Sequence, residues 1–177
     1  MKKILSFIAI LTACYSMNGQ AYGSEIDLSI GVTQKGFAAY GAYNYHLSET
    51  TKIKTGGYAS FSTLDKNEID VDFNIYQINA QYMSLVTSNR RDGLSLYFGA
   101  GALIGWEDIS VNKNFVASDA LVLNESGFIY GLLISAELDI YLSKQSSFIL
   151  YANEQWHIQS NLGKFIPYVG VGYRYTL

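Results

Sequence analysis

The 177-residue sequence has very little cysteine, proline, histidine or charge. Its one cysteine, Cys14, lies near the N-terminus, which excludes intrachain disulfides and metal sites built on several cysteines. Charged residues make up 15% of the chain, whereas soluble domains have about 25%. A net charge of −3 without a basic run gives no electrostatic footprint for nucleic acid. The composition therefore indicates that something other than water contacts much of the surface.

Long apolar runs are also missing. Beyond the N-terminal segment, no stretch reaches the roughly 18 apolar residues of a transmembrane helix. Residues 1–21 have two lysines, an apolar stretch and a small-residue end at Ala21, as in a secretory signal peptide that is cleaved. Residues 22–177 would then form a single domain. A second possibility is cleavage before Cys14, because Leu11–Cys14 fits a lipobox whose cysteine becomes lipidated.

The sequence is rich in tyrosine and glycine, with 15 and 16 residues, and apolar residues alternate with small or polar ones. Period-two alternation is typical of strands with one apolar face. It occurs in eight segments: 25–33, 37–47, 52–61, 71–82, 94–106, 128–142, 147–158 and 165–177. In the fourth segment the phase changes, which predicts a bulge near Tyr76 or a strand that starts later.

The connections between these segments alternate in character. Short polar stretches follow the second, fourth and sixth segments, whereas residues 63–70 and 107–126 are longer loops after the third and fifth. Transmembrane barrels have short periplasmic turns on one rim and longer extracellular loops on the other, and strands of about ten residues cross a bilayer at a tilt. The sequence therefore predicts an all-β fold, an eight-stranded antiparallel up-and-down transmembrane β-barrel of the outer-membrane type.

A soluble, lipocalin-like barrel would alternate in the same way, with its apolar face inward. Here the polar face is mostly Gly, Ser, Asn and Tyr, which fits a narrow lumen better than a water-washed exterior. Aromatic residues on the apolar face form two groups, as do the girdles at membrane interfaces. The predicted girdles contain Tyr43, Tyr45, Phe148, Tyr173 and Tyr175 near the turns, and Phe61, Trp106, Phe128 and Trp156 near the loops.

These girdles favour a barrel in the outer membrane of a Gram-negative bacterium, in contact with lipid. A barrel held by its own lipid-facing surface has little need of an acyl anchor. We therefore favour cleavage near Ala21 over lipidation, and predict that Cys14 is absent from the mature protein.

Charged residues on the polar face are expected to gather in the turn-side half of the lumen. This predicted cluster consists of Asp27, Lys52, Lys54, Glu137, Asp139 and Arg174. Charges that are desolvated in a narrow interior need partners. Barrel closure makes the first and last strands neighbours, so Asp27 and Arg174 are plausible partners. Because side chains just fill an eight-stranded barrel, we expect the cluster to plug the lumen rather than form an ion pathway.

The sequence predicts no catalytic residue, cofactor or metal site. Its two histidines, His46 and His157, are expected near opposite ends of the barrel, and neither has a recognisable Ser-His-acid spacing. Asp70, Asp72 and Asn74 match the start of a calcium loop. The glycine and the terminal glutamate of such a loop are missing, so we assign these residues to a strand rim.

One residue breaks the alternation. Glu154 falls on the apolar face of its segment, together with Phe148, Leu150 and Trp156. It marks a bulge, a contact with another protein or a shifted register, and the sequence leaves all three open.

Three strand segments carry a family resemblance. The stretches "GLSLYFGAGALIGWE", "NESGFIYGLLISAELDIYLS" and "NLGKFIPYVGVGYRYTL" resemble, in this order and spacing, the TraO family of conjugal transfer proteins from Bacteroidetes conjugative transposons. The resemblance covers about Ile75 to Leu177. It implies an outer-membrane component of a mating apparatus, a type IV secretion-like system, with other apparatus proteins as partners. The family offers no catalytic residues.

The stretch "GVGYRYTL" also resembles the final-strand signal read by the outer-membrane assembly machinery, although it ends on Leu177 where phenylalanine is usual. Our first hypothesis is a non-enzymatic barrel that serves conjugative DNA transfer by contacting partner proteins, through loop 107–126 and the short turns. The alternatives are a lipid-modifying barrel enzyme and a general surface or adhesion barrel.

Overall fold

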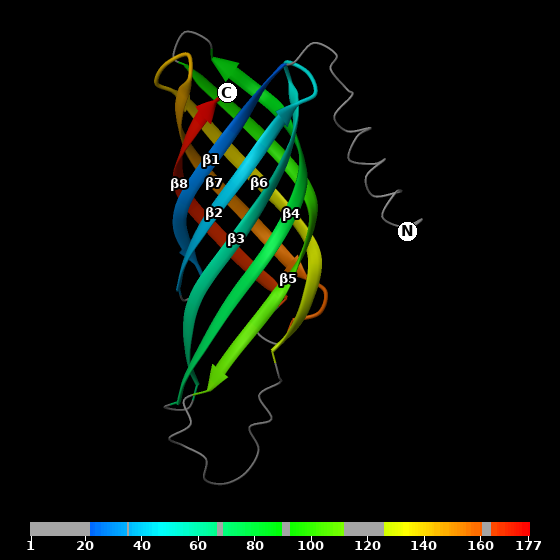
Figure 1. Cartoon of the computed structure of the whole chain (residues 1–177), viewed down its shortest axis with the longest axis vertical. Helices are drawn as coiled ribbons and strands as arrows, with labels where there is room; N and C mark the ends of the chain where they lie inside the picture. The colour runs from blue at the N-terminus through cyan, green and yellow to red at the C-terminus, as the bar shows by residue number, and fades with distance from the viewer. Residues whose placement is uncertain (1–21, 35, 67–68, 90–92, 112–125, 161–163) are drawn as a thin grey trace, which may run out of the picture.

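The computed structural model describes residues 22–34, 36–66, 69–89, 93–111, 126–160 and 164–177. Its strands are β1 (Tyr22–Thr33), β2 (Gly36–His46), β3 (Thr51–Lys66), β4 (Ile69–Asn89), β5 (Leu94–Val111), β6 (Gly127–Tyr141), β7 (Ser146–His157) and β8 (Phe165–Thr176). Each strand pairs antiparallel with the next, and β1 pairs with β8, so the sheet closes into a barrel (Figure 1). The predicted fold class is confirmed. The described residues include no helix long and apolar enough to cross a membrane.

Two tight turns, between β2 and β3 and between β6 and β7, lie at the rim where β1 begins and β8 ends, at the top of Figure 1. The amides of Leu47 and Ser48 donate to the Thr51 carbonyl, at 2.9 and 3.2 Å. The amides of Leu142 and Ser143 make the equivalent bonds to Ser146, at 2.9 and 3.0 Å. Serine is suited to such turns because its hydroxyl bonds nearby backbone groups.

The opposite rim differs from the predicted one, because β3, β4 and β5 project beyond the other strands (Figure 1). The predicted loop 63–70 is mostly strand, since β3 runs to Lys66 and β4 begins at Ile69. Likewise, β5 continues to Val111, so strand occupies the beginning of predicted loop 107–126. The polar residues of these stretches led to the prediction of loops. A strand that extends beyond the apolar belt does not contact lipid, so it can have polar residues on both faces.

The outer surface of the barrel is apolar and its interior is polar. Leu28, for example, is 67% exposed, whereas the next inward residue, Asp27, is 0% exposed. This distribution is the reverse of that in a soluble protein, where charged residues are almost never fully buried unless paired. It favours the transmembrane barrel over the lipocalin-like alternative.

The predicted bulge near Tyr76 is wrong, and so is the predicted late start of that strand. The β4–β5 register is unbroken through Tyr76, and the irregularity lies between Leu85 and Thr87 instead. Ile75 faces the interior with 0% exposure, whereas Ile78 faces outward. The lumen near the long-loop rim is partly apolar, so apolar residues change face without any break in the strand.

Tyrosine rings fill the middle of the lumen. They belong to Tyr40, Tyr58, Tyr151 and Tyr168. Tyr40 and Tyr151 stack with ring centroids 5.2 Å apart, and the Tyr40 hydroxyl donates to Asn79 Oδ1 at 2.9 Å. Inward glycines leave room for these rings, because a Cβ at Gly170 would lie 2.3 Å from the Tyr168 hydroxyl. The abundant tyrosine and glycine of the sequence therefore have complementary places in the interior.

The closed sheet makes a simple prediction for gel migration. Every strand has two hydrogen-bonded neighbours, so the barrel should resist detergent until it is heated. We expect an unheated sample to migrate at a different position from a boiled one. If both samples migrated together, the protein would not contain a folded transmembrane barrel under those conditions.

Candidate functional site: the buried charge cluster

The structure places all six predicted lumen charges inside the barrel, in the half next to the short turns. They come from four strands: Asp27 from β1, Lys52 and Lys54 from β3, Glu137 and Asp139 from β6, and Arg174 from β8. All six are 0% exposed. We call this set, together with Glu25, the charge cluster.

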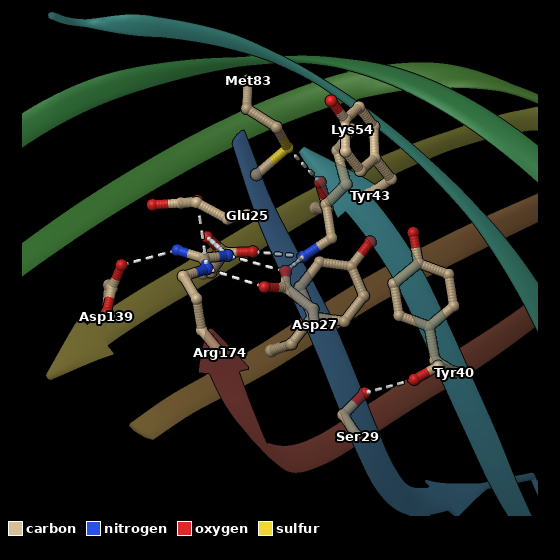
Figure 2. Close-up of polar contacts among 12 residues, drawn as sticks. Glu25, Asp27, Ser29, Tyr40, Tyr43, Lys54, Met83, Asp139 and Arg174 are labelled. Atoms are coloured by element: carbon tan, nitrogen blue, oxygen red, sulfur yellow. Dashed lines mark hydrogen bonds and ion pairs between the residues drawn. The ribbon is translucent and has the colours of Figure 1, made fainter. Parts of the chain in front are cut away.

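Arg174 lies at the centre of the charge cluster (Figure 2). Its Nε and Nη2 atoms donate to the two carboxylate oxygens of Asp27, each at 2.7 Å. Nη1 donates to Asp139 Oδ2 at 2.5 Å, and Nη2 also donates to Glu137 Oε1 at 2.7 Å. Asp27 and Arg174 are directly opposite in the β1–β8 ladder. The planar guanidinium therefore joins β6 to the seam at which the barrel closes.

The two lysines extend this network across the lumen. Lys52 Nζ donates to Glu137 Oε1 at 2.7 Å. Lys54 Nζ donates to Asp27 Oδ2 at 2.8 Å and also to Glu137. Each ammonium group lies over an aromatic ring, Lys52 at 4.1 Å from the Tyr97 centroid and Lys54 at 4.3 Å from that of Tyr151. Such cation–π contacts strengthen when they are desolvated.

The sequence analysis missed Glu25 as a member of the cluster. Its carboxylate is 3.2 Å from Arg174 Nε and 3.7 Å from Lys52 Nζ, and His46 Nε2 lies 3.1 Å from it. Glu25 lies two residues before Asp27 on β1, so the alternation alone places both side chains on the same face of the strand. With Glu25 included, four carboxylates face three cations, and His46 is a further basic group at the rim of the cluster.

The cluster can close the lumen, because its side chains cross the interior from four strands. Desolvation of so many charges is tolerable only because nearly every group has an opposite charge within bonding distance. No group of three or more His, Cys, Asp or Glu side chains in the described ranges is placed to hold a metal ion. The cluster therefore fits a structural role that holds β1, β3, β6 and β8 together.

The other sequence candidates lie apart from the cluster. His157 is fully buried near the long-loop rim, where it is opposite Gly131 on β6, far from His46 at the turn rim. Of the calcium-like motif, the side chain of Asp70 lies outside the description, and Asp72 Oδ1 accepts a hydrogen bond from the Thr63 hydroxyl at 2.8 Å. This hydrogen bond joins the neighbouring strands β3 and β4, as expected for residues at a strand rim.

The structure places the predicted girdle aromatics on the outer face, at the two rims to which the alternation assigned them. Tyr45 is partly exposed and the others more so: Tyr43, Phe61, Trp106, Phe128, Phe148, Trp156, Tyr173 and Tyr175. Near the long-loop rim, Phe61 stacks on Phe37 with centroids 5.3 Å apart and meets Tyr76 edge-on at 6.1 Å. An apolar belt of Leu, Ile, Val and Ala separates the two girdles.

The family model "Conjugative transposon protein TraO" matches residues 23–177. The chain belongs to the TraO family. The match covers β1–β8, whereas the resemblance seen in the sequence was limited to about residues 75–177. Membership implies a role in conjugative transposons for this TraO-family chain. No curated protein sequence matches it.

Several solved structures with a similar fold are outer-membrane or surface proteins. Neisserial surface protein A is 13% identical, with a TM-score of 0.60, over 87% of this chain and 96% of that one. Ail, the attachment invasion locus protein of Yersinia pestis, is 19% identical, with a TM-score of 0.54, over 88% and 99%. A major outer membrane protein from Thermus thermophilus is 8% identical, with a TM-score of 0.64, over 88% and 100%. At these identities the likeness concerns the fold alone.

The seam contact makes a prediction about stability. We expect Asp27→Asn and Arg174→Gln each to lower the free energy of unfolding by about 3–5 kcal/mol, because each leaves buried charge uncompensated. The double variant should cost less than the two single effects added together. The measurement is urea unfolding of the barrel in lipid vesicles, followed by the fluorescence of Trp106 and Trp156. Additive effects below about 1 kcal/mol each would show that water screens the cluster.

Proposed function

We propose that this protein is a non-enzymatic outer-membrane component of the conjugative DNA transfer apparatus. The observation that carries the proposal is the TraO match over residues 23–177. The outer-membrane location is supported by the apolar belt between two aromatic girdles and by the fold shared with outer-membrane proteins. Export by a cleaved signal peptide at residues 1–21, which lie outside the described residues, is part of the proposal.

The protein acts by contacting other apparatus proteins, not by conducting DNA. An eight-stranded barrel is only wide enough for its own side chains, and here the charge cluster and the tyrosines occupy that space. The contact surfaces we propose are the short turns and the loop that connects β5 to β6. The base of that loop is fastened, since the Ser126 hydroxyl accepts from the Ile109 amide at 3.1 Å and donates to Asp108 at 2.9 Å.

The non-enzymatic part of the proposal is supported by the positions of the histidines. Hydrolysis or transfer of an acyl chain by a serine nucleophile needs a histidine within hydrogen-bond reach of that serine. Neither His46 nor His157 makes such a bond in the described part of the chain. A lipid-modifying barrel enzyme is therefore the alternative that the next experiment tests.

Gene deletion in a donor strain should strongly reduce transfer of the element. We expect the wild-type gene to restore mating, and His46→Ala and His157→Ala to restore it equally, because neither imidazole takes part in a reaction. Transfer frequency between donor and recipient is the measurement, with membrane lipid composition determined in parallel. Normal mating with altered lipids in the deletion strain would favour the enzyme and refute the proposal.

The plugged lumen makes a separate prediction. In planar lipid bilayers, we expect the purified barrel to give no conductance steps above background, because paired charges and tyrosine rings fill its interior. A large-barrel porin in the same bilayer is the positive control. Conductance steps of porin size from the wild-type protein would contradict the plug.

A further inference from the structure

Glu154 faces outward from β7 into the apolar belt. Asn153 and Gln155, its chain neighbours, point into the lumen and are buried, so the pleat directs Glu154 away from it. Its ladder partners are Ile134 on β6 and Pro167 on β8, and Trp156 of the girdle lies two residues nearer the loop rim. Among the described strand residues, Glu154 is the only charged one that faces outward between the two girdles.

The structure removes two of the three explanations that the sequence left open. The β6–β7 ladder runs without a shift from Gly131↔His157 to Tyr141↔Ser147. The β7–β8 ladder is equally regular from Ser146↔Tyr175 to Trp156↔Phe165. Glu154 therefore marks neither a bulge nor a shifted register, and contact with another protein is the explanation that remains.

A carboxylate at this depth requires a partner, and the described part of the chain does not supply one. Within the described ranges, Glu154 makes no hydrogen bond or ion pair, in contrast to every carboxylate of the charge cluster. Lipid tails have no donors, so an ionisable group that faces hydrocarbon is unfavourable unless another group compensates it. The face around Glu154 is therefore incomplete in the isolated barrel.

Small residues and a hollow lie next to Glu154. Ala136 and Ala152 are opposite each other in the β6–β7 ladder, two pairs further from the loop rim than Glu154. They line a hollow of about 440 Å³, whose wall also includes the outward Leu150 and Val169 and the inward Glu137 and Tyr151. Glu154 itself is not part of the lining. Small residues allow close approach of a second backbone, which is how protein segments associate inside membranes.

We propose that the β6–β8 face around Glu154 binds a membrane-spanning segment of another apparatus protein, which brings an arginine or lysine to Glu154. We infer this occupant from charge complementarity, because an arginine or lysine would compensate the Glu154 carboxylate. Two copies of the chain related by a two-fold axis along the membrane normal would bring two Glu154 carboxylates to the same depth, where they repel. Anionic lipid headgroups repel a carboxylate as well. The inference rests on the proposed function, because it takes the partner from the same apparatus.

A second, larger hollow of about 1080 Å³ is the natural comparison. Its lining comes from all eight strands and includes Gly41, Gly57 and Ala59 on β2 and β3, two strands that do not pair with β7. No charged residue lines it, so lipid chains suffice to fill it. It therefore provides control positions with similar side chains and no carboxylate.

The first test measures mating by donors that carry Glu154→Leu, Glu154→Gln or the control Thr55→Leu, an outward polar residue on β3. We expect Glu154→Leu to fold, with the same heat-dependent gel shift as the wild type, and to reduce transfer by about tenfold or more, the scale expected when one member of a desolvated charge pair is lost. Glu154→Gln, which keeps a hydrogen-bond acceptor, should fall between Glu154→Leu and the wild type. Thr55→Leu should mate normally. Wild-type mating by Glu154→Leu would overturn the inference.

The second test places a photo-crosslinking residue at Ala152, or at the control position Ala59, in intact donor cells. We expect one discrete adduct from Ala152 that disappears with Glu154→Leu and in donors that lack the other transfer genes. An adduct that persists without those genes, or equal yields from both positions, would overturn the inference. If gene deletion itself leaves mating unchanged, the proposed function fails, whereas a deletion defect with normal mating by Glu154→Leu refutes only the Glu154 contact.

Discussion

The contact between Arg174 and Asp27 is the interaction on which the rest of the barrel depends. These two residues face each other across the β1–β8 seam, where strands from the two ends of the described barrel meet. The Arg174 guanidinium donates hydrogen bonds to three carboxylates, which lie on β1 and β6. Lys54 on β3 donates to two of the same carboxylates, those of Asp27 and Glu137. The pairing works only when the barrel is closed, so the energy of the cluster becomes available only after all of these strands are in register.

The charge cluster occupies the turn-side half of the lumen. A lumen filled with paired charges, tyrosines and amides has no room for a transported strand, which is why the proposed contacts lie on the outer surface and at the rims. The chain belongs to a conjugation family, and its interior is organised as a packed scaffold. The ends of β3–β5 project beyond the other strands (Figure 1), and Glu154 faces outward in the apolar belt.

Sequence reasoning succeeded where one rule covered a whole strand. The alternation placed the girdles and six members of the cluster, and closure suggested the Asp27–Arg174 pair. It failed where the environment changes along a strand. Ile75 faces inward because the outer lumen is partly apolar, so the apolar pattern changed face without the predicted bulge. Glu25 was not predicted as a member of the cluster, although it lies two residues before Asp27 and therefore faces the same way.

The sequence by itself determined the strand number, the two faces of each strand, the up-and-down order and the family, because period-two alternation and connection length are local properties of the chain. Only the tertiary structure decided which charges meet. Lys54 and Glu137 are far apart in the chain, and the register of every intervening strand sets whether their atoms come together. The same holds for Glu154. The sequence shows that it interrupts the alternation, but the unbroken ladders on both sides show that its carboxylate faces outward, where it makes no hydrogen bond or ion pair within the described residues.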